Sequence, residues 1–190
     1  MRRMRQNNRV FGGALLAGLV LAGGGGLAAA SGGARARASK VPLVNLTLSS
    51  STGLEPIAAR YTCDGADQSL PLSWGRIPYG TVELAVFIIN SEPVHGKFVV
   101  DWAVTGLKPS LRKLSAGQLP AGAVVGRNSF GQARYSICPP RGARAGYLIR
   151  LDALPKRVGE RPGFNAPVQL TPVIRASSFS GLLGFSYKRR

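Results

Sequence analysis

The chain has 190 residues, of which 45% are hydrophobic and only 17% are charged, and this composition excludes an intrinsically disordered polymer. The 25 Gly and 13 Pro residues make up one fifth of the chain, which argues against a helical bundle and for strands joined by tight turns. One histidine, His95, and two cysteines, Cys63 and Cys138, are too few for a structural zinc site, so we expect neither a metal nor a cofactor.

The formal net charge is +17. Residues 1–40 hold seven basic residues and no acidic one, while residues 41–190 hold the other 18 basic and all 8 acidic residues, a net charge of +10. Such a surface favours anionic partners such as phospholipid headgroups or cell-wall polymers, the alternative being an ordinary solvated surface. Since the chain has no run of five basic residues and no aromatic RNA-binding motif, no nucleic-acid partner is expected.

The N-terminus has the order of a secretory signal. Met1–Arg9 is polar with four arginines, Val10–Ala22 is an uncharged apolar run of 13 residues, and Ala28–Ala30 supplies small residues for cleavage before Ser31. Residues 1–30 are therefore predicted to be a signal peptide or a signal anchor. Residues 31–40 are small and basic, which is typical of a flexible linker.

The alternative to cleavage is a membrane anchor, because the 21 residues Val10–Ala30 carry no charge and are long enough to span a bilayer. Membrane contact would then be made through the uncleaved N-terminus. Both interpretations predict that residues 41–190 are exported, either secreted or anchored outside the cytoplasm. Gly24 stands where a lipoprotein signal has its cysteine, so lipid attachment has no thiol at that position.

Residues 41–190 are predicted to form one domain rich in strands. Residues 41–51 alternate apolar and polar side chains as an edge strand does, and residues 58–63 predict a second short strand. Residues 81–90 are mostly apolar and β-branched, which indicates a strand buried on both faces. In the strand predicted at 97–105, alternation places Phe98, Val100, Trp102 and Val104 on one face and Asp101 on the other.

The C-terminal part predicts strands at 147–154 and 184–188. Thr171 followed by Pro172 fits a helix N-cap and first-turn proline, so a short helix is expected to begin there. The whole pattern predicts a mainly β fold of two packed antiparallel sheets with one or two short helices.

Three blocks of sequence share a spacing with a known family. Tyr61–Trp74 reads YTCDGADQSLPLSW, Leu84–Val104 reads LAVFIINSEPVHGKFVVDWAV, and Gly126–Leu154 contains a Cys-Pro-Pro loop. In this order the blocks resemble the phosphatidylethanolamine-binding protein family, in particular its bacterial Raf-kinase-inhibitor-like branch. The resemblance implies that family's β fold and a small surface pocket that binds phosphate or a phospholipid headgroup.

The resemblance also implies which residues line the pocket: Asn90, Asp101, Pro139, Pro140, Gly142, Arg144 and Tyr147. Asp101 and Ala145 stand where the family has histidines, so a phosphate would meet a carboxylate in place of a donor. We therefore expect a degenerate pocket. Asp101 is expected beside Asn90 and Tyr147, on the face opposite Trp102, either paired with an arginine such as Arg144 or exposed to water.

Two further features follow from the resemblance. Arg134, Arg141 and Arg144 flank the pocket loop and could replace the lost donors, the alternative being three solvated side chains. Cys63 and Cys138 both occupy positions that carry cysteine in the family pattern, which predicts a disulfide in an exported domain. Two buried thiols are the alternative.

These observations predict an exported, non-catalytic binding domain. A cell-envelope scaffold or an inhibitory protein-interaction domain with a vestigial pocket and an envelope protein partner is the alternative. A hydrolase is disfavoured, because no nucleophile elbow or metal motif frames the single histidine.

Overall fold

The computed structural model describes residues 46–92 and 96–190. The predicted signal or anchor (1–30), the linker (31–40), the start of the strand predicted at 41–51, and His95 lie outside the described residues.

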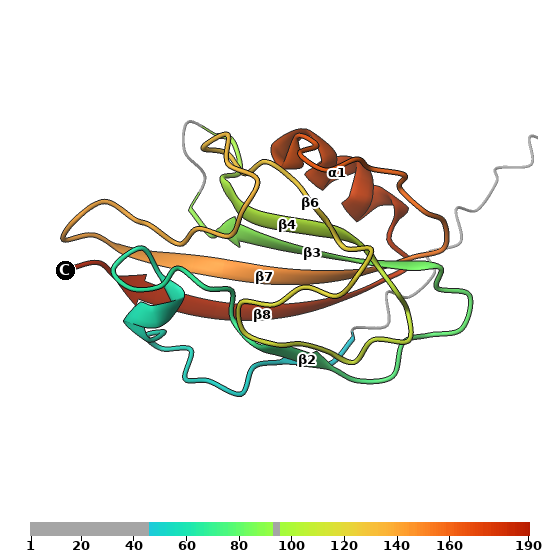
Figure 1. Cartoon of the computed structure of the whole chain (residues 1–190), viewed down its shortest axis with the longest axis horizontal. Helices are drawn as coiled ribbons and strands as arrows, with labels where there is room; N and C mark the ends of the chain where they lie inside the picture. Colours follow the sequence, from blue (N-terminus) through green and yellow to red (C-terminus); the bar gives the residue numbers. More distant parts are fainter. Residues whose placement is uncertain (1–45, 93–95) are drawn as a thin grey trace, which may run out of the picture. The chain divides into compact units, whose positions relative to one another are not determined.

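The described part of the chain folds into two antiparallel sheets and one α-helix, which confirms the predicted fold class (Figure 1). The larger sheet has the strand order β6-β4-β3-β7-β8 and the smaller one has the order β1-β2-β5. The bounds are β1 Leu48–Ser49, β2 Leu72–Trp74, β3 Glu83–Asn90, β4 Val100–Leu107, β5 Lys113–Leu114, β6 Val124–Val125, β7 Arg144–Leu154 and β8 Phe179–Lys188. Helix α1 spans Ala166–Ala176, and a 3-10 helix, η1, spans Ala59–Tyr61.

Strand β3 is the centre of the larger sheet, and its apolar sequence allows it to be covered on both sides. Val86 and Ile88 face the smaller sheet and pack in one apolar core with Trp74. Phe87, on the other face, packs in a second core with Leu170 of α1. The fold therefore has three layers, with the smaller sheet, the larger sheet and the helix stacked in that order (Figure 1).

The helix begins earlier than predicted. Asn165 is the N-cap, where its side chain accepts a hydrogen bond from the Val168 N–H at 3.3 Å, and Pro167 lies in the first turn. Pro172, expected to open the helix, lies inside it. The N-cap and proline pattern occurs twice in this stretch, and the earlier copy begins the helix because it lets Leu170 bury against the sheet.

Two other local predictions were wrong. The strand expected at 58–63 is instead the 3-10 helix η1, because the Thr62 N–H and hydroxyl both bond to the Ala59 carbonyl and close a tight turn. The strand predicted at 97–105 begins only at Val100, so Phe98, expected on the same face as Trp102, precedes β4 and is 60% exposed.

Gly106 is required by the close approach of β4 to the loop at Gly122. Its φ is +72°, and a Cβ atom there would lie 2.6 Å from the Gly122 carbonyl oxygen. Gly106→Ala is expected to lower the free energy of unfolding by about 3 kcal/mol, because backbone strain and a steric collision add. Chemical denaturation monitored by Trp fluorescence would measure the loss.

Gly80→Ala is the matched control for this prediction. Gly80 has a φ of +83°, but nothing lies within 4 Å of the added Cβ. Only the strain remains there, about 1 kcal/mol. Equal losses in the two variants would contradict the collision at Gly106.

Candidate functional site

A β-bulge places Asp101 on the inner side of the larger sheet. Ile88 pairs with Trp102 and Ile89 pairs with Val100, so one step along β3 corresponds to two steps along β4. Asp101 is the extra residue, and such a bulge re-aims a side chain. The simple alternation that put Asp101 on the face opposite Trp102 is therefore wrong.

The side chain of Asp101 is buried among tyrosines. Burial raises the pKa of both Tyr135 and Tyr147, which belong to the same core as Trp102, and the charge of the nearby Asp101 raises it further. Tyr135 stands edge-on to Trp102 with ring centroids 5.6 Å apart, and Tyr147 stacks on Phe185 at 4.9 Å. The surroundings of the carboxyl group are therefore largely aromatic.

The carboxyl group of Asp101 is buried with an incomplete set of hydrogen bonds. Asp101 is 3% exposed, and its Oδ2 atom has no hydrogen-bond partner among the described residues. Burial, helped by the negative charge of Asp67, raises the pKa of Asp101 to about 8. Near neutral pH the group is therefore mostly protonated, in contrast to an ordinary surface aspartate.

The expectation that Asp101 either pairs with Arg144 or is exposed to water is wrong. Arg144 and Tyr147 are three residues apart on β7, so their side chains leave opposite faces of the sheet. Arg144 instead forms an ion pair with Glu55 at 3.3 Å and donates a hydrogen bond to Ser186 at 3.0 Å.

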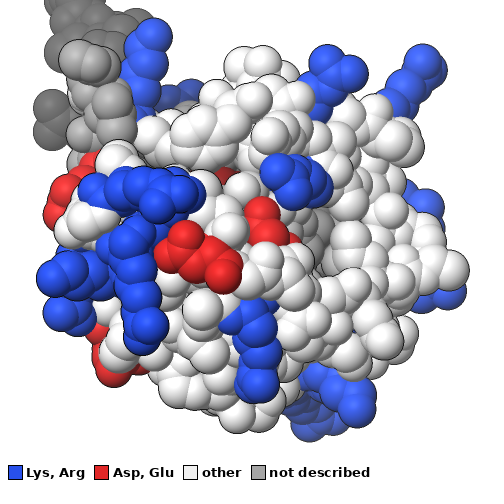
Figure 2. Space-filling model, turned by 60° about the vertical axis from the view of Figure 1, so that its left-hand side comes forward, with Lys and Arg blue, Asp and Glu red and all other residues white. Residues whose placement is uncertain are grey.

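Among the described residues, neither of the other two flanking arginines forms an ion pair or a hydrogen bond with the carboxyl group of Asp101. Arg134 forms an ion pair with Asp67 at 3.6 Å, and Arg141 is exposed. On the face shown in Figure 2, Lys and Arg side chains cover more of the surface than Asp and Glu. The basic charge therefore lies at the surface while Asp101 remains inside.

Asn90 lies at the same end of the larger sheet as Asp101 and Tyr147. Asn90 is opposite Tyr147 in the register of β3 with β7, so the two side chains share a face. The amide oxygen of Asn90 accepts a hydrogen bond from the Glu92 N–H at 2.9 Å and holds the turn that follows β3. Asn90, Asp101 and Tyr147 therefore lie at one end of the larger sheet.

The loop of Pro139, Pro140 and Gly142 is tied to the C-terminal end of the chain. Arg189 donates to the Pro139 carbonyl at 3.2 Å, and the Gly142 N–H donates to the Arg189 carbonyl at 3.2 Å. Pro139 is buried, while Pro140 and Gly142 are exposed. Pro139 and Gly142 thus contact the segment after β8, while the Pro140 carbonyl accepts from the Ala143 N–H of its own loop at 3.0 Å.

The predicted disulfide is confirmed: Cys63 and Cys138 are bonded, with their Cα atoms 5.3 Å apart. It joins two loops that also share hydrogen bonds. The Cys63 N–H donates to the Ile137 carbonyl at 3.1 Å, and the Tyr135 hydroxyl donates to the Tyr61 carbonyl at 2.9 Å. The disulfide and the two hydrogen bonds therefore fix these loops to each other, near the buried Asp101.

Asn128 is a residue whose role sequence reasoning missed. Its amide nitrogen donates to the Asp101 carbonyl at 3.5 Å and to the Arg134 carbonyl at 3.4 Å. Its amide oxygen accepts from the N–H groups of Phe130 and Gln132, both at 3.0 Å. Asn128 thus joins the loop after β6 to the bulge. Asn128 lies in the third block of the family resemblance, Gly126–Leu154, but its bond to Asp101 joins residues that are 27 positions apart in the sequence.

The comparisons with known proteins agree with this geometry. The sequence pattern described as phosphatidylethanolamine-binding protein matches residues 49–179, more than half of the chain. The chain belongs to the phosphatidylethanolamine-binding protein family. Proteins of this family generally bind small ligands or phospholipid headgroups.

Two relatives illustrate the range of the family. The lipoprotein LppC of Mycobacterium tuberculosis is 34% identical over 125 residues, which are 65% of this chain and 61% of LppC. The UPF0098 protein of Methanothermobacter thermautotrophicus is 35% identical over 113 residues, which are 56% of this chain and 74% of that protein. The chain thus matches less than two thirds of the length of LppC.

Solved structures show the same fold. Escherichia coli YbcL, described as a member of the mammalian PEBP family, superposes with a TM-score of 0.69 at 23% identity and covers 77% of this chain and 99% of its own. The PEBP homologue CT736 of Chlamydia trachomatis gives 0.68 at 22% identity, with the same coverage.

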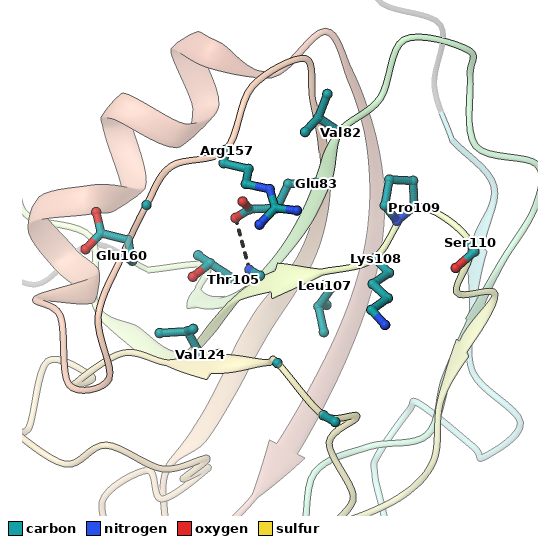
Figure 3. A pocket seen from close by; sticks show the side chains of 14 residues that line it. Val82, Glu83, Thr105, Leu107, Lys108, Pro109, Ser110, Val124, Arg157 and Glu160 are labelled. Atoms are coloured by element: carbon teal, nitrogen blue, oxygen red, sulfur yellow. Dashed lines mark hydrogen bonds between the residues drawn. The ribbon is translucent and has the colours of Figure 1, made fainter.

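This family member also has an open cavity of about 670 Å³ at the other end of β3 (Figure 3). Glu83, 5% exposed, accepts a hydrogen bond from the Gly106 N–H at 3.0 Å, and Arg157 points toward it from the loop after β7. Lys108 and Glu160 also line the cavity, so its charges are mixed. Sequence reasoning did not single out these residues.

In the parts of the chain that the structure describes, no group of three His, Cys, Asp or Glu residues is placed to hold a metal ion. In those same parts no helix is both long and apolar enough to cross a bilayer.

The raised pKa of Asp101 predicts a pH-dependent stability. An unfolded chain releases this proton near the ordinary value of 3.8, whereas the folded domain keeps it up to about 8. Between these values the folded state binds more protons, so stability falls as pH rises, by roughly 4 kcal/mol at pH 7. Asp101→Asn, which stays neutral, should remove most of this fall in urea unfolding measured from pH 4 to pH 8.

Asp64→Asn is the matched control. The hydrogen bond from Tyr187, at 2.6 Å, is the largest cause that lowers the pKa of Asp64. The contribution of Asp64 to stability is therefore lost only as the pH falls below the range from pH 4 to pH 8. Asp64→Asn should therefore keep the full fall between pH 4 and pH 8. Burial also raises the pKa of Asp152, so a smaller fall should remain in Asp101→Asn. An unchanged slope in Asp101→Asn would contradict the buried acid.

Proposed function

We propose that this chain is an exported, non-catalytic binding domain in which the family's anion pocket has become degenerate. The observation that carries the proposal is the buried carboxyl group of Asp101, which lies where the resembled family has a histidine. Ala145, in the same core, replaces the second histidine with a methyl group.

The chemistry of these replacements weakens phosphate binding. A protonated Asp101 offers one neutral donor where two histidines would offer stronger, charge-assisted ones. Above pH 8 the carboxyl group is ionised and repels an anion. Since Arg134 and Arg144 are engaged by Asp67 and Glu55, they supply no evident replacement.

Export is supported by two independent features. The disulfide between Cys63 and Cys138 is typical of proteins that mature in an oxidising compartment. The relative LppC is named as a lipoprotein, which is consistent with a location outside the cytoplasm.

The second candidate function is an envelope scaffold or inhibitory protein-interaction domain with a vestigial pocket. The buried state of the Asp101 carboxyl oxygen favours it, because a ligand cannot contact that atom without a rearrangement. The binding experiment below distinguishes the two functions.

Free phosphate and phosphoethanolamine should bind no more tightly than millimolar, about −4 kcal/mol or weaker. Asp101→His together with Ala145→His should tighten binding of phosphoethanolamine, because two donors replace an acid and a methyl group. Isothermal titration calorimetry on both proteins measures the difference.

Thermal unfolding of the double variant serves as the control for its fold. Micromolar binding by the unmodified protein would contradict a degenerate pocket. A folded double variant that gains no affinity would show that the two positions do not face a common ligand, and the scaffold function would then be favoured.

Export makes a separate prediction. Protein recovered from outside the cytoplasm should begin near Ser31, because the signal resembles a cleavable one. Edman sequencing of that protein tests this. Full-length chain in the membrane fraction would favour the anchor, and chain confined to the cytosol would contradict both forms of export.

A further inference from the structure

A second surface of the domain lies beside the N-terminal half of α1. An open groove of about 880 Å³ runs between this helix and the segments 96–99 and 127–131. Among its described lining residues there are two basic side chains, Lys97 and Arg127, and no Asp or Glu. The groove belongs to the helix side of the sheet, whereas Asp101 faces the other core, so it is distinct from the family pocket.

Large apolar side chains stand at the rim of this groove. Phe98 and Val168 both line it and are 60% and 62% exposed. Phe130, 57% exposed, does not itself line the groove but belongs to segment 127–131, whose residues Ser129 and Gly131 do. Single exposed apolar residues are ordinary, but three on the segments that form one groove mark an interaction surface.

The two basic side chains are available to a partner. The four ion pairs of the described residues engage Arg134, Arg144, Arg150 and Arg189, and neither Lys97 nor Arg127 is among them. Both side chains are exposed. A partner for this surface therefore carries negative charge beside an apolar phase.

The three segments of the rim are bonded to one another. Ser129 and Val100 exchange two hydrogen bonds, from the Ser129 N–H at 2.8 Å and to its hydroxyl at 2.9 Å. The Arg127 N–H donates to the Phe164 carbonyl at 2.7 Å, and the Arg127 carbonyl accepts from the Ala166 N–H at 3.0 Å. The apolar and basic groups are thus held together before any partner arrives, which lowers the entropic cost of binding.

We propose that this groove docks the domain on an anionic phospholipid bilayer. Phe98, Phe130 and Val168 enter the headgroup region, and Lys97 and Arg127 pair with lipid phosphates around them. Apolar groups ringed by long basic side chains are the combination that binds at a bilayer surface, since the apolar part leaves water while the charges stay at the headgroups. An acidic protein would match the two charges but would need acceptors placed between three apolar side chains.

Amide hydrogen exchange of the full chain tests the proposal. The protein is mixed with vesicles of phosphatidylcholine alone, or of phosphatidylcholine with phosphatidylglycerol. The seven basic residues of 1–40 also attract anionic vesicles, so the readout is the exchange of the groove segments themselves and its response to substitutions in the groove. Exchange in segments 96–99, 127–131 and 166–171 should slow only with the anionic vesicles, and added salt should reverse the slowing.

Substitutions locate the effect. Lys97→Gln with Arg127→Gln should lower the docking equilibrium constant, taken from the slowing, by about thirtyfold. Arg76→Gln with Lys113→Gln removes the same charge from exposed positions elsewhere and should change it little. Phe98→Ser should weaken docking, while Tyr79→Ser, at a fully exposed turn position, should not.

Three results would overturn the proposal. Equal exchange in the two kinds of vesicle would remove the anionic bilayer as the partner. Equal losses in the two charge variants would reduce the effect to net charge. Slowing of the groove segments by polyglutamate, without slowing by anionic vesicles, would assign the groove to an acidic protein.

Discussion

The burial of β3 on both faces is the constraint from which the rest of the architecture follows. Seven of its eight residues are buried, so the strand needs a sheet on one side and a helix on the other. Because its middle is apolar, polar groups can meet it only at its two ends. Glu83 stands at one end beside an open cavity, and Asn90 stands at the other beside Asp101 and Tyr147.

Three local features allow Asp101 to be buried at the Asn90 end of β3. The bulge turns Asp101 inward, Asn128 bonds to its carbonyl, and the carboxyl group keeps its proton near neutral pH. A charged, unpaired carboxylate in this position would cost several kcal/mol. A group of this kind is better suited to a neutral environment than to a phosphate, which is the physical argument for the degenerate pocket that we propose.

The distribution of charge explains how one domain can present two different surfaces. Half of the eight acidic side chains form ion pairs with arginines of the same domain, namely Glu55, Asp64, Asp67 and Asp152. Asp64 also accepts a hydrogen bond from the Tyr187 hydroxyl. The positive charge that remains unpaired lies outside. Around the groove beside α1 it occurs together with exposed apolar groups. A bilayer contact there would orient the domain while leaving the family pocket on the opposite side of the sheet free.

The sequence by itself determined the mainly β class, the doubly buried strand at 81–90 and the pairing of Cys63 with Cys138. Alternation and apolar runs are local properties, and the cysteine positions followed from the family pattern. The bulge at Asp101, the pairing of Arg144 with Glu55 and the start of α1 at Ala166 were decided only by the tertiary structure. Each depends on what a distant segment places opposite the residue: the register of β3, the position of Glu55, or the apolar face that receives Leu170. A local pattern of side chains contains no information about these partners, because the chain brings them together only when it folds.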